Sequence, residues 1–256
     1  MTDERRPILE MRGIVKRFGG VTALRGVDFV LYDAELVAII GDNGAGKSTL
    51  IKIISGVYTP DEGEIYLWDQ PVKLRSPEDA RRYGIETVHQ TLALADNMDV
   101  VSNLFLGREL TRGWFGPLFH IINRSAMEKR TREVLAELEV EIPSLRAPVK
   151  SLSGGQRQGI ALGRAIAFGQ KILILDEPTA ALGLRETRKV VDLIMRLKAQ
   201  KMPIIMISHS LPLVFEVADR IVILRNGQVV GERDPAQTAQ EELLALMVGI
   251  REAKVS

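Results

Sequence analysis

The stretch GDNGAGKST, at residues 41–49, decides how the rest of the chain folds. Five apolar residues stand before it at 36–40, and a second, mostly apolar run follows it at 50–54. The first run is too short for a helix and ends in a turn signal, so it predicts a buried strand, while the second run predicts a helix. A strand, a glycine-rich turn and a helix form the context in which the pattern G-x-x-x-x-G-K-[ST] marks a phosphate-binding loop.

Such a loop holds phosphate in three ways. Its glycines allow backbone conformations that a Cβ would forbid, so the amides of residues 43–48 can point at an anion, and the start of the helix adds partial positive charge. Lys47 would reach the β- and γ-phosphates, and Ser48 would place its hydroxyl on Mg²⁺. We therefore predict, against the alternative of a chance glycine turn, that a nucleoside triphosphate binds at Gly41, Asp42, Asn43, Gly44, Ala45, Gly46, Lys47, Ser48 and Thr49.

The composition narrows the class of protein. The chain has 256 residues, enough for one or two domains, and a formal net charge of +1, so no overall field draws it to nucleic acid or anionic lipid. It has no cysteine, which excludes disulfides and cysteine-bound metals and suits a reducing compartment. The first residues lack the apolar core of a signal peptide, and no apolar run approaches the roughly 18 residues of a membrane helix. We expect a soluble chain, for which any membrane role must come through a partner.

Strand-like and helix-like segments alternate over most of the chain, as in an α/β fold with a mostly parallel sheet covered on both faces. Gly19-Gly20 and Asn226-Gly227 mark two hairpins. The expected strands are residues 8–18, 21–31, 36–40, 64–68, 85–88, 172–175, 204–207, 221–225 and 228–233. One helix is expected directly after the phosphate-binding loop and another begins at Pro77. Three more are expected at residues 184–200, 212–217 and 235–248.

The pattern changes between about residues 91 and 151. Strand-like runs disappear, helices are expected at 99–106 and 125–138, and the segment GWFGPLFH at 113–120 is apolar and irregular. We expect a helical subdomain inserted into the α/β core.

A strand at residues 172–175 ends in two carboxylates, Asp176 and Glu177. In nucleoside triphosphatases (NTPases) with a phosphate-binding loop, an aspartate at a strand end holds Mg²⁺ on the nucleotide, and Asp176 suits that role. Glu177 leaves the strand facing differently and could orient or deprotonate the attacking water. The alternative is that the pair only caps a helix before Pro178.

The stretch LSGGQRQ, at residues 152–158, opens another helix. Ser153 and Gln156 form a capping box of the type S-x-x-Q. A capping box does not need Gly154 and Gly155, whereas two glycines leave a helix end bare enough to touch a phosphate. Because one phosphate-binding loop is already present, a second such helix end indicates a second nucleotide-bearing partner.

Taken together, GDNGAGKST, LSGGQRQ, ILILDEPTAAL and IMISHS resemble the ATP-binding-cassette (ABC) ATPases, in the order and spacing of that family, from about residue 8 to residue 249. The resemblance implies an α/β, P-loop NTPase (RecA-like) core, an antiparallel β subdomain and an inserted helical subdomain. It implies one ABC ATPase domain over residues 1–256, with a core of about 1–90 and 152–256 and a helical subdomain of about 91–151.

The resemblance also assigns roles, with ATP as nucleotide and Mg²⁺ as cofactor. Phe18 matches the aromatic residue that stacks on adenine, although it could also be plain hairpin core. Gln90 matches the glutamine that contacts Mg²⁺. Glu177 matches the catalytic carboxylate and His209 the switch histidine on the γ-phosphate, which together with Lys47 form the catalytic set. The signature residues that close on the other subunit's ATP are Ser153, Gly154, Gly155 and Gln156.

One loop departs from the family pattern. Residues 179–183 read TAALG, and glycine stands at 183 where the family usually has aspartate, which puts communication between subunits at this loop in doubt. The same AALG, with SGVYTPDEG at 55–63 and NLFLGRE at 103–109, resembles the monosaccharide importers of the ribose, xylose and fructose type. Most ATPases of those importers have two cassettes fused in one chain, so a single cassette fits the fructose-type systems better, or a homodimer generally.

The resemblance therefore implies an ATPase that drives monosaccharide uptake. Its partners would be a second copy of the chain, membrane permease subunits and, indirectly, a sugar-binding protein, with no nucleic acid. The chain would lie peripherally on the cytoplasmic face of the plasma membrane. Two alternatives stay open: an importer or exporter of another substrate, such as an amino acid or lipid, and a soluble ABC factor acting on ribosomes or DNA. A phosphoryl-transfer kinase would use the same loop but has no use for LSGGQ.

Overall fold

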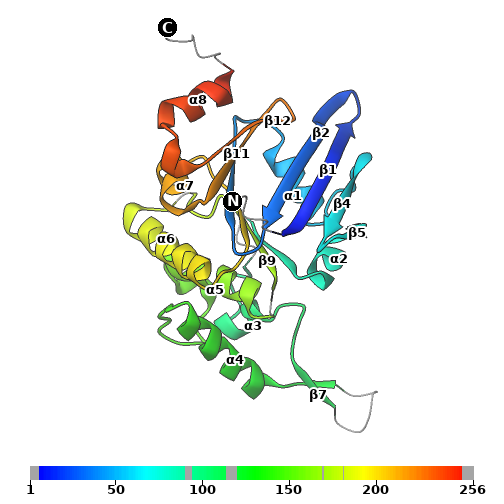
Figure 1. Cartoon of the computed structure of the whole chain (residues 1–256). Coiled ribbons are helices and arrows are strands. Elements are labelled where there is room, and N and C mark those ends of the chain that lie inside the picture. Colours follow the sequence, from blue (N-terminus) through cyan, green and yellow to red (C-terminus); the bar gives the residue numbers. More distant parts are fainter. Residues whose placement is uncertain (1–5, 90–93, 114–119, 169, 181, 250–256) are drawn as a thin grey trace. The chain divides into compact units, whose positions relative to one another are not determined.

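The computed structural model describes residues 6–89, 94–113, 120–168, 170–180 and 182–249 (Figure 1). The chain divides into two compact units. The first comprises residues 1–87, 171–178 and 197–256, and the second comprises residues 88–170 and 179–196. The block expected to be helical, 91–151, lies in the second unit, which also contains residues 152–170 and 179–196.

The first unit contains a four-stranded antiparallel sheet with the order β2-β1-β4-β5. Its strands are β1 (Pro7–Phe18), β2 (Val21–Tyr32), β4 (Glu62–Leu67) and β5 (Gln70–Val72). The predicted antiparallel β subdomain is thereby confirmed. The predicted strand 64–68 is shifted, because Trp68 and Asp69 have φ angles of 48° and 63° and form the turn between β4 and β5.

The second sheet of this unit has six strands in the order β12-β11-β3-β10-β9-β6. They are β3 (Leu36–Ile40), β6 (Ile85–Val88), β9 (Ile172–Asp176), β10 (Ile204–Ile207), β11 (Arg220–Arg225) and β12 (Gln228–Arg233). Strands β11, β3, β10 and β9 are parallel neighbours, whereas β12 returns antiparallel through Asn226-Gly227. Every residue of β3 and β10 is buried, as expected for strands covered on both faces.

The helices of the first unit are α1 (Lys47–Ile54), α2 (Pro77–Arg82), α7 (Leu211–Val217) and α8 (Gln240–Val248), with a 3₁₀ turn at Pro235–Gln237. The prediction of one closing helix over 235–248 is wrong. Asp234 accepts the Ala236 amide and caps only the short turn, after which Thr238 and Ala239 are extended. The helix begins again at Gln240.

One apolar core connects both sheets of the first unit. Side chains from β1, β3 and α1, among them Leu9, Ile39 and Leu50, belong to the same buried cluster. Because α1 is held in this core, the loop that precedes it is anchored at both ends.

The second unit is mainly helical. Its helices are α3 (Val100–Leu104), α4 (Arg124–Glu137), α5 (Gly154–Ile166) and the part of α6 (Leu184–Ala199) up to residue 196, with a 3₁₀ turn at Val149–Ser151. The expectation that strands are absent here is wrong, because β7 (Thr111–Gly113) pairs with β8 (His120–Ile122). Strands of three residues are too short to leave an alternating pattern. Residues 114–119, the middle of the apolar stretch noted above, lie outside the described residues.

No helix among the described residues is long and apolar enough to cross a membrane.

Candidate functional site

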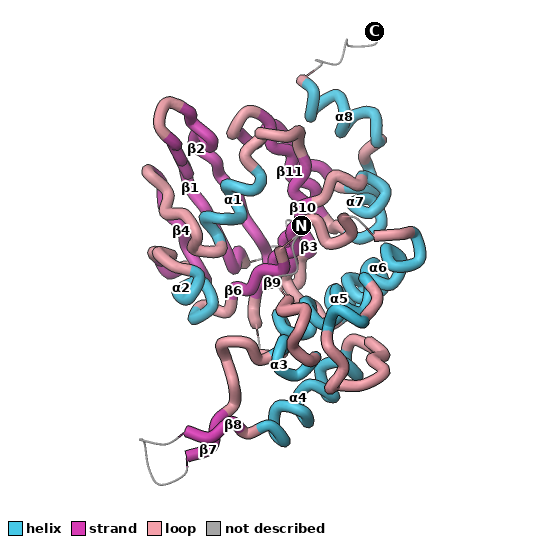
Figure 2. Tube along the Cα trace, turned by 180° about the vertical axis from the view of Figure 1, so that it is seen from behind, coloured by secondary structure: helices cyan, strands magenta, loops and turns pink. Residues whose placement is uncertain are grey.

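The phosphate-binding loop connects β3 to α1 in the first unit (Figure 2). Its glycines have φ angles of 152° at Gly41, 82° at Gly44 and 106° at Gly46. A Cβ on Gly41 would lie 2.1 Å from the carbonyl oxygen of Leu224, and one on Gly46 would lie 2.8 Å from Cδ2 of Leu24. Both the backbone conformation and the close packing therefore require glycine at 41 and 46, while only the conformation requires it at 44.

Lys47 is the first residue of α1, and its side chain is held inside the loop. Its Nζ donates hydrogen bonds to the carbonyl oxygens of Gly41 at 2.6 Å and Asp42 at 2.9 Å. Burial lowers the pKa of Lys47, and the nearby carboxylates oppose that shift. No side chain caps the start of α1, so the amides of its first turn face the loop. Ser48 is exposed and Thr49 is half-buried.

The two carboxylates lie where β9 and β10 end. Asp176 pairs with Ile207 in parallel register, and the Glu177 amide donates to the carbonyl oxygen of Ile207 at 3.0 Å. This register brings Glu177 to His209: Glu177 Oε2 accepts from the His209 amide at 3.3 Å, and Glu177 Oε1 lies 3.2 Å from His209 Nε2. The second contact does not have hydrogen-bond geometry, and Oε1 is a buried oxygen without a hydrogen-bond partner among the described residues.

The surroundings of Glu177 favour proton uptake. Burial raises the pKa of its carboxyl group, and Asp176 raises it further, whereas His209 and Lys47 lower it without reversing the shift. A carboxylate with a raised pKa is a stronger base than an ordinary glutamate. Glu177 also has a φ of 53°, an uncommon conformation for a residue with a side chain. The structure thus gathers Lys47, Asp176, Glu177 and His209 at the carboxyl ends of β3, β9 and β10, where open α/β sheets bind ligands.

Phe18 stands at the end of β1, and its side chain is 41% exposed. The hairpin β1–β2 is tied to the phosphate-binding loop through Gly227. The Gly227 amide donates to the carbonyl oxygen of Ala45 at 2.9 Å, and the Arg25 amide donates to the carbonyl oxygen of Gly227 at 2.8 Å. Phe18 therefore belongs to the same unit and the same hydrogen-bonded frame as the loop.

The signature stretch begins α5 in the second unit. Ser153 Oγ accepts the Gln156 amide at 3.3 Å, and Gln156 Oε1 accepts the Ser153 amide at 3.0 Å, so the predicted capping box is present. A Cβ on Gly154 would lie 2.9 Å from Cδ2 of Leu182, the end of a half-buried and flexible side chain, so space alone does not exclude a side chain there. Gly155 faces Glu186 in the same unit.

The structure says less about two other features of the sequence, the glycine at 183 and Gln90. Gly183 accepts the Thr187 amide at 2.9 Å and so begins α6, and a Cβ there would meet only the flexible end of Glu186, at 2.8 Å. Space alone therefore does not exclude a side chain at 183. Gln90 lies outside the described residues, and its role stays a prediction.

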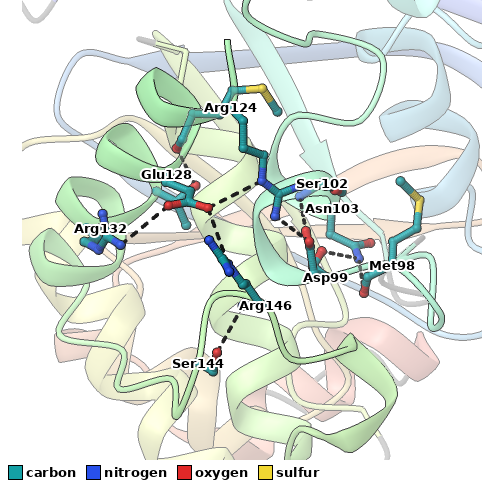
Figure 3. Close-up of polar contacts among 11 residues, drawn as sticks. Met98, Asp99, Ser102, Asn103, Arg124, Glu128, Arg132, Ser144 and Arg146 are labelled. Atoms are coloured by element: carbon teal, nitrogen blue, oxygen red, sulfur yellow. Dashed lines mark hydrogen bonds and ion pairs between the residues drawn. The ribbon is translucent and has the colours of Figure 1, made fainter. Parts of the chain in front are cut away.

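A polar network in the second unit was not predicted (Figure 3). Asn103 is fully buried, and its side chain bonds the backbone of Ala95, Met98 and Asp99. Arg124 lies between Asp99 and Glu128, with which it forms ion pairs. The only sequence signal was Asp99 at the start of the helix expected at 99–106, and an aspartate there is an ordinary helix cap.

Asp99 gives a test of this network. Burial acts to raise its pKa, but hydrogen bonds from Arg124 and Ser102 outweigh that effect and hold the pKa below its usual value. A lowered pKa in the folded state means stability that is present above the unfolded value of about 3.9 and lost as pH falls through the folded value. We expect Asp99→Asn to lower the free energy of unfolding by about 1 kcal/mol at pH 7, and by much less near pH 3.

Urea denaturation at both pH values measures this difference. The control is Asp192→Asn, which removes a solvent-exposed ion pair with Arg188 and should change stability little at either pH. An equal penalty for Asp99→Asn at pH 7 and pH 3 would contradict an ionic contribution.

Comparison with known proteins agrees with this geometry. A family model described as ABC transporter matches residues 24–180. The chain is 51% identical over 248 residues to the fructose import ATP-binding protein FrcA of Rhizobium meliloti, which covers 96% of this chain and 95% of the relative. It is 45% identical over 244 residues to the ribose import ATP-binding protein RbsA 1 of Rubrobacter xylanophilus, covering 95% of this chain but 47% of that relative. The chain thus spans about half the length of the ribose protein and nearly all of the fructose protein.

Among solved structures, a dimeric ATP-binding cassette in a post-hydrolysis state, bound to ADP and phosphate, is similar with a TM-score of 0.72. Its sequence is 27% identical, and the match covers 89% of this chain and 98% of that one. These comparisons confirm the resemblance to monosaccharide-import ATPases and the α/β P-loop fold. The family model matches more than half of the chain, and the fructose import protein is identical to it at half of the aligned positions over nearly the full length of both. The chain therefore belongs to the ABC transporter family of ATP-binding cassettes.

Proposed function

We propose that this chain is the ATP-hydrolysing subunit of an importer that takes up a monosaccharide through separate permease subunits. The observation that carries the proposal is the gathering of Lys47, Asp176, Glu177 and His209 around one phosphate-binding loop. The fructose and ribose import proteins named above support the substrate class. The identity of 51% with the fructose protein, against 45% with the ribose protein, supports the fructose type.

In this proposal Lys47, Glu177 and His209 each have one task in ATP hydrolysis. Lys47 leaves the carbonyl oxygens of Gly41 and Asp42 and places its charge on the phosphates. Glu177 takes the proton of the attacking water, a step that its raised pKa favours. His209, whose amide and ring already contact the Glu177 carboxylate, holds the γ-phosphate.

The residues present also fit Mg²⁺. This ion prefers oxygen ligands and is usually bound by one or two protein groups together with phosphate oxygens and waters. The Ser48 hydroxyl and the Asp176 carboxylate supply such oxygens, with Gln90 as the further predicted ligand. Bound there, Mg²⁺ would neutralise charge developing on the transferred phosphate.

In this proposal the signature helix acts on the nucleotide of a second copy of the chain. Ser153–Gln156 lie in the second unit, at the start of α5, and the N-terminal end of a helix favours an anion. We propose that in a two-fold dimer they cap the ATP held by the partner's phosphate-binding loop, so that two equal sites form at once. The similarity to a dimeric cassette bound to ADP and phosphate supports this arrangement.

The remaining partners follow from the function. Permease subunits would carry the sugar across the membrane, and a sugar-binding protein would deliver it. The cassette would then sit peripherally on the cytoplasmic face of the plasma membrane.

A reconstitution experiment tests this proposal. We expect liposomes that hold the chain together with its permease to take up a labelled monosaccharide in the presence of Mg-ATP, with the sugar-binding protein supplied outside. Liposomes with this chain alone should take up none. Uptake by the chain alone, or transport of amino acids or lipids but of no sugar by the full set, would overturn it.

A further inference from the structure

Phe18 is not an isolated ring. The ring of Tyr58 meets it edge-on, with centroids 5.1 Å apart and an angle of 65° between the planes. Such edge-to-face pairs are favourable beyond the area they bury and fix the relative orientation of the rings. Two cations flank the pair: Lys16 Nζ lies 5.6 Å from the Phe18 centroid, and Lys52 Nζ lies 5.4 Å from the Tyr58 centroid.

Tyr58 is better anchored than Phe18. It is half-buried and packs against the apolar core of the first unit, whereas Phe18 is 41% exposed at the tip of a hairpin. The Tyr58 amide donates to the carbonyl oxygen of Lys52 at 2.9 Å, so its backbone is held on the last turn of α1. The ring of Tyr58 therefore supplies the fixed side of the pair.

The same helix begins at the phosphate-binding loop. Helix α1 starts at Lys47, and the bond from Tyr58 to Lys52 joins its far end to the aromatic pair. The turn beyond Tyr58 is tied back to β1, because Lys16 Nζ donates to the carbonyl oxygen of Thr59 at 2.8 Å and to Asp61 Oδ1 at 2.9 Å. A rigid helix thus connects the group that holds phosphate to the group that orients Phe18.

We infer that Tyr58 is a positioning residue for the nucleobase: it holds the Phe18 ring in the plane on which the base stacks, at a distance from the phosphate-binding loop that α1 sets. This rests on the proposed function as an ATPase and on the role that the resemblance assigns to Phe18, the ring on which adenine stacks. Without the Tyr58 ring, Phe18 would be free to turn, and binding would have to restrict that motion at a cost to affinity. The phosphate contacts would not change.

The test compares two ligands of the purified full chain, ATP and inorganic triphosphate, each with Mg²⁺, by isothermal titration calorimetry. We expect Tyr58→Leu to raise the Kd for ATP about three- to tenfold, the worth of an aromatic pair, and to leave the Kd for triphosphate unchanged. Tyr58→Phe keeps the ring and should restore ATP binding. The matched control is Tyr83→Leu, which removes another partly exposed tyrosine of the same unit, next to α2, and should change neither Kd.

Three results would overturn the inference. The first is that Tyr58→Leu weakens the binding of ATP and of triphosphate equally, which would mean general damage to the site. The second is that Tyr58→Leu changes neither Kd. The third is that the effects of Phe18→Ala and Tyr58→Leu on ATP binding are fully additive in the double variant, because the effect of Tyr58→Leu should vanish once the Phe18 ring is gone.

The single variant Phe18→Ala distinguishes a failure of this inference from a failure of the assignment of Phe18 as the base platform. Weaker binding of ATP, but not of triphosphate, supports the base platform. If Phe18→Ala affects both ligands alike, the platform assignment is wrong and the role of Tyr58 is lost with it. If Phe18→Ala discriminates and Tyr58→Leu does not, only the positioning role fails. Thermal denaturation of each variant identifies any that does not fold, and Tyr58→Met then replaces Tyr58→Leu.

Discussion

Replacing Glu177 with glutamine is expected to lower ATP turnover at least about 100-fold, the usual contribution of a general base, while ATP still binds. Glutamine has the shape of glutamate but cannot take the proton of water. It also places an uncharged amide where the structure has a half-buried carboxylate with an unbonded oxygen, so the fold should tolerate it. Steady-state hydrolysis and calorimetric ATP binding measure the two quantities separately.

The same substitution reveals the dimer. ATP that is bound but not hydrolysed should hold two chains together, so Glu177→Gln with Mg-ATP is expected to elute as a dimer in size-exclusion chromatography. The unsubstituted chain should return to monomer as ATP is consumed. Adding Ser153→Arg should abolish the dimer, because a bulky cation would occupy the space that the serine leaves for the partner's γ-phosphate.

Two results would contradict this picture. A Glu177→Gln variant that hydrolyses ATP at the unsubstituted rate would remove Glu177 from catalysis. A double variant with Ser153→Arg that still dimerises in ATP would show that the signature residues do not cap the partner's nucleotide. A Glu177→Gln variant that stays monomeric would mean that the isolated cassette dimerises too weakly without its permease.

Replacing Lys47 with alanine is expected to weaken ATP binding about 10- to 100-fold, because hydrogen bonds from a charged group to phosphate are lost. In the structure the Lys47 ammonium is already inside the loop, 2.6 Å from the carbonyl oxygen of Gly41 and 2.9 Å from that of Asp42. Its charge is therefore close to where phosphate would lie, and little rearrangement is needed. Calorimetric titration with Mg-ATP gives the change directly.

The control for this variant is Lys129→Ala, which removes an exposed lysine from α4 at the same cost in net charge. It should leave ATP binding unchanged. Normal binding and hydrolysis by Lys47→Ala would refute the assignment of the phosphate-binding loop.

The sequence by itself determined the elements whose signals are local. The glycines at 41, 44 and 46 and the apolar strands β3, β9 and β10 could be read directly, because φ preferences and hydrophobic periods act over a few residues. Hairpin turns and helix caps were predictable for the same reason. Where local signals were weak, the prediction was wrong. The strands β7 and β8 were missed because they are only three residues long. The closing helix was predicted to run without a break over 235–248, although residues 238–239 have extended backbone.

Only the tertiary structure decided which side chains meet. Glu177 and His209 are 32 residues apart, and they touch because β9 and β10 pair in one particular parallel register. The contact of Tyr58 with Phe18 likewise depends on segments that fold toward each other. A pattern along the chain carries no distance between such groups. The burial that raises the pKa of Glu177 arises only once the surrounding segments are in place.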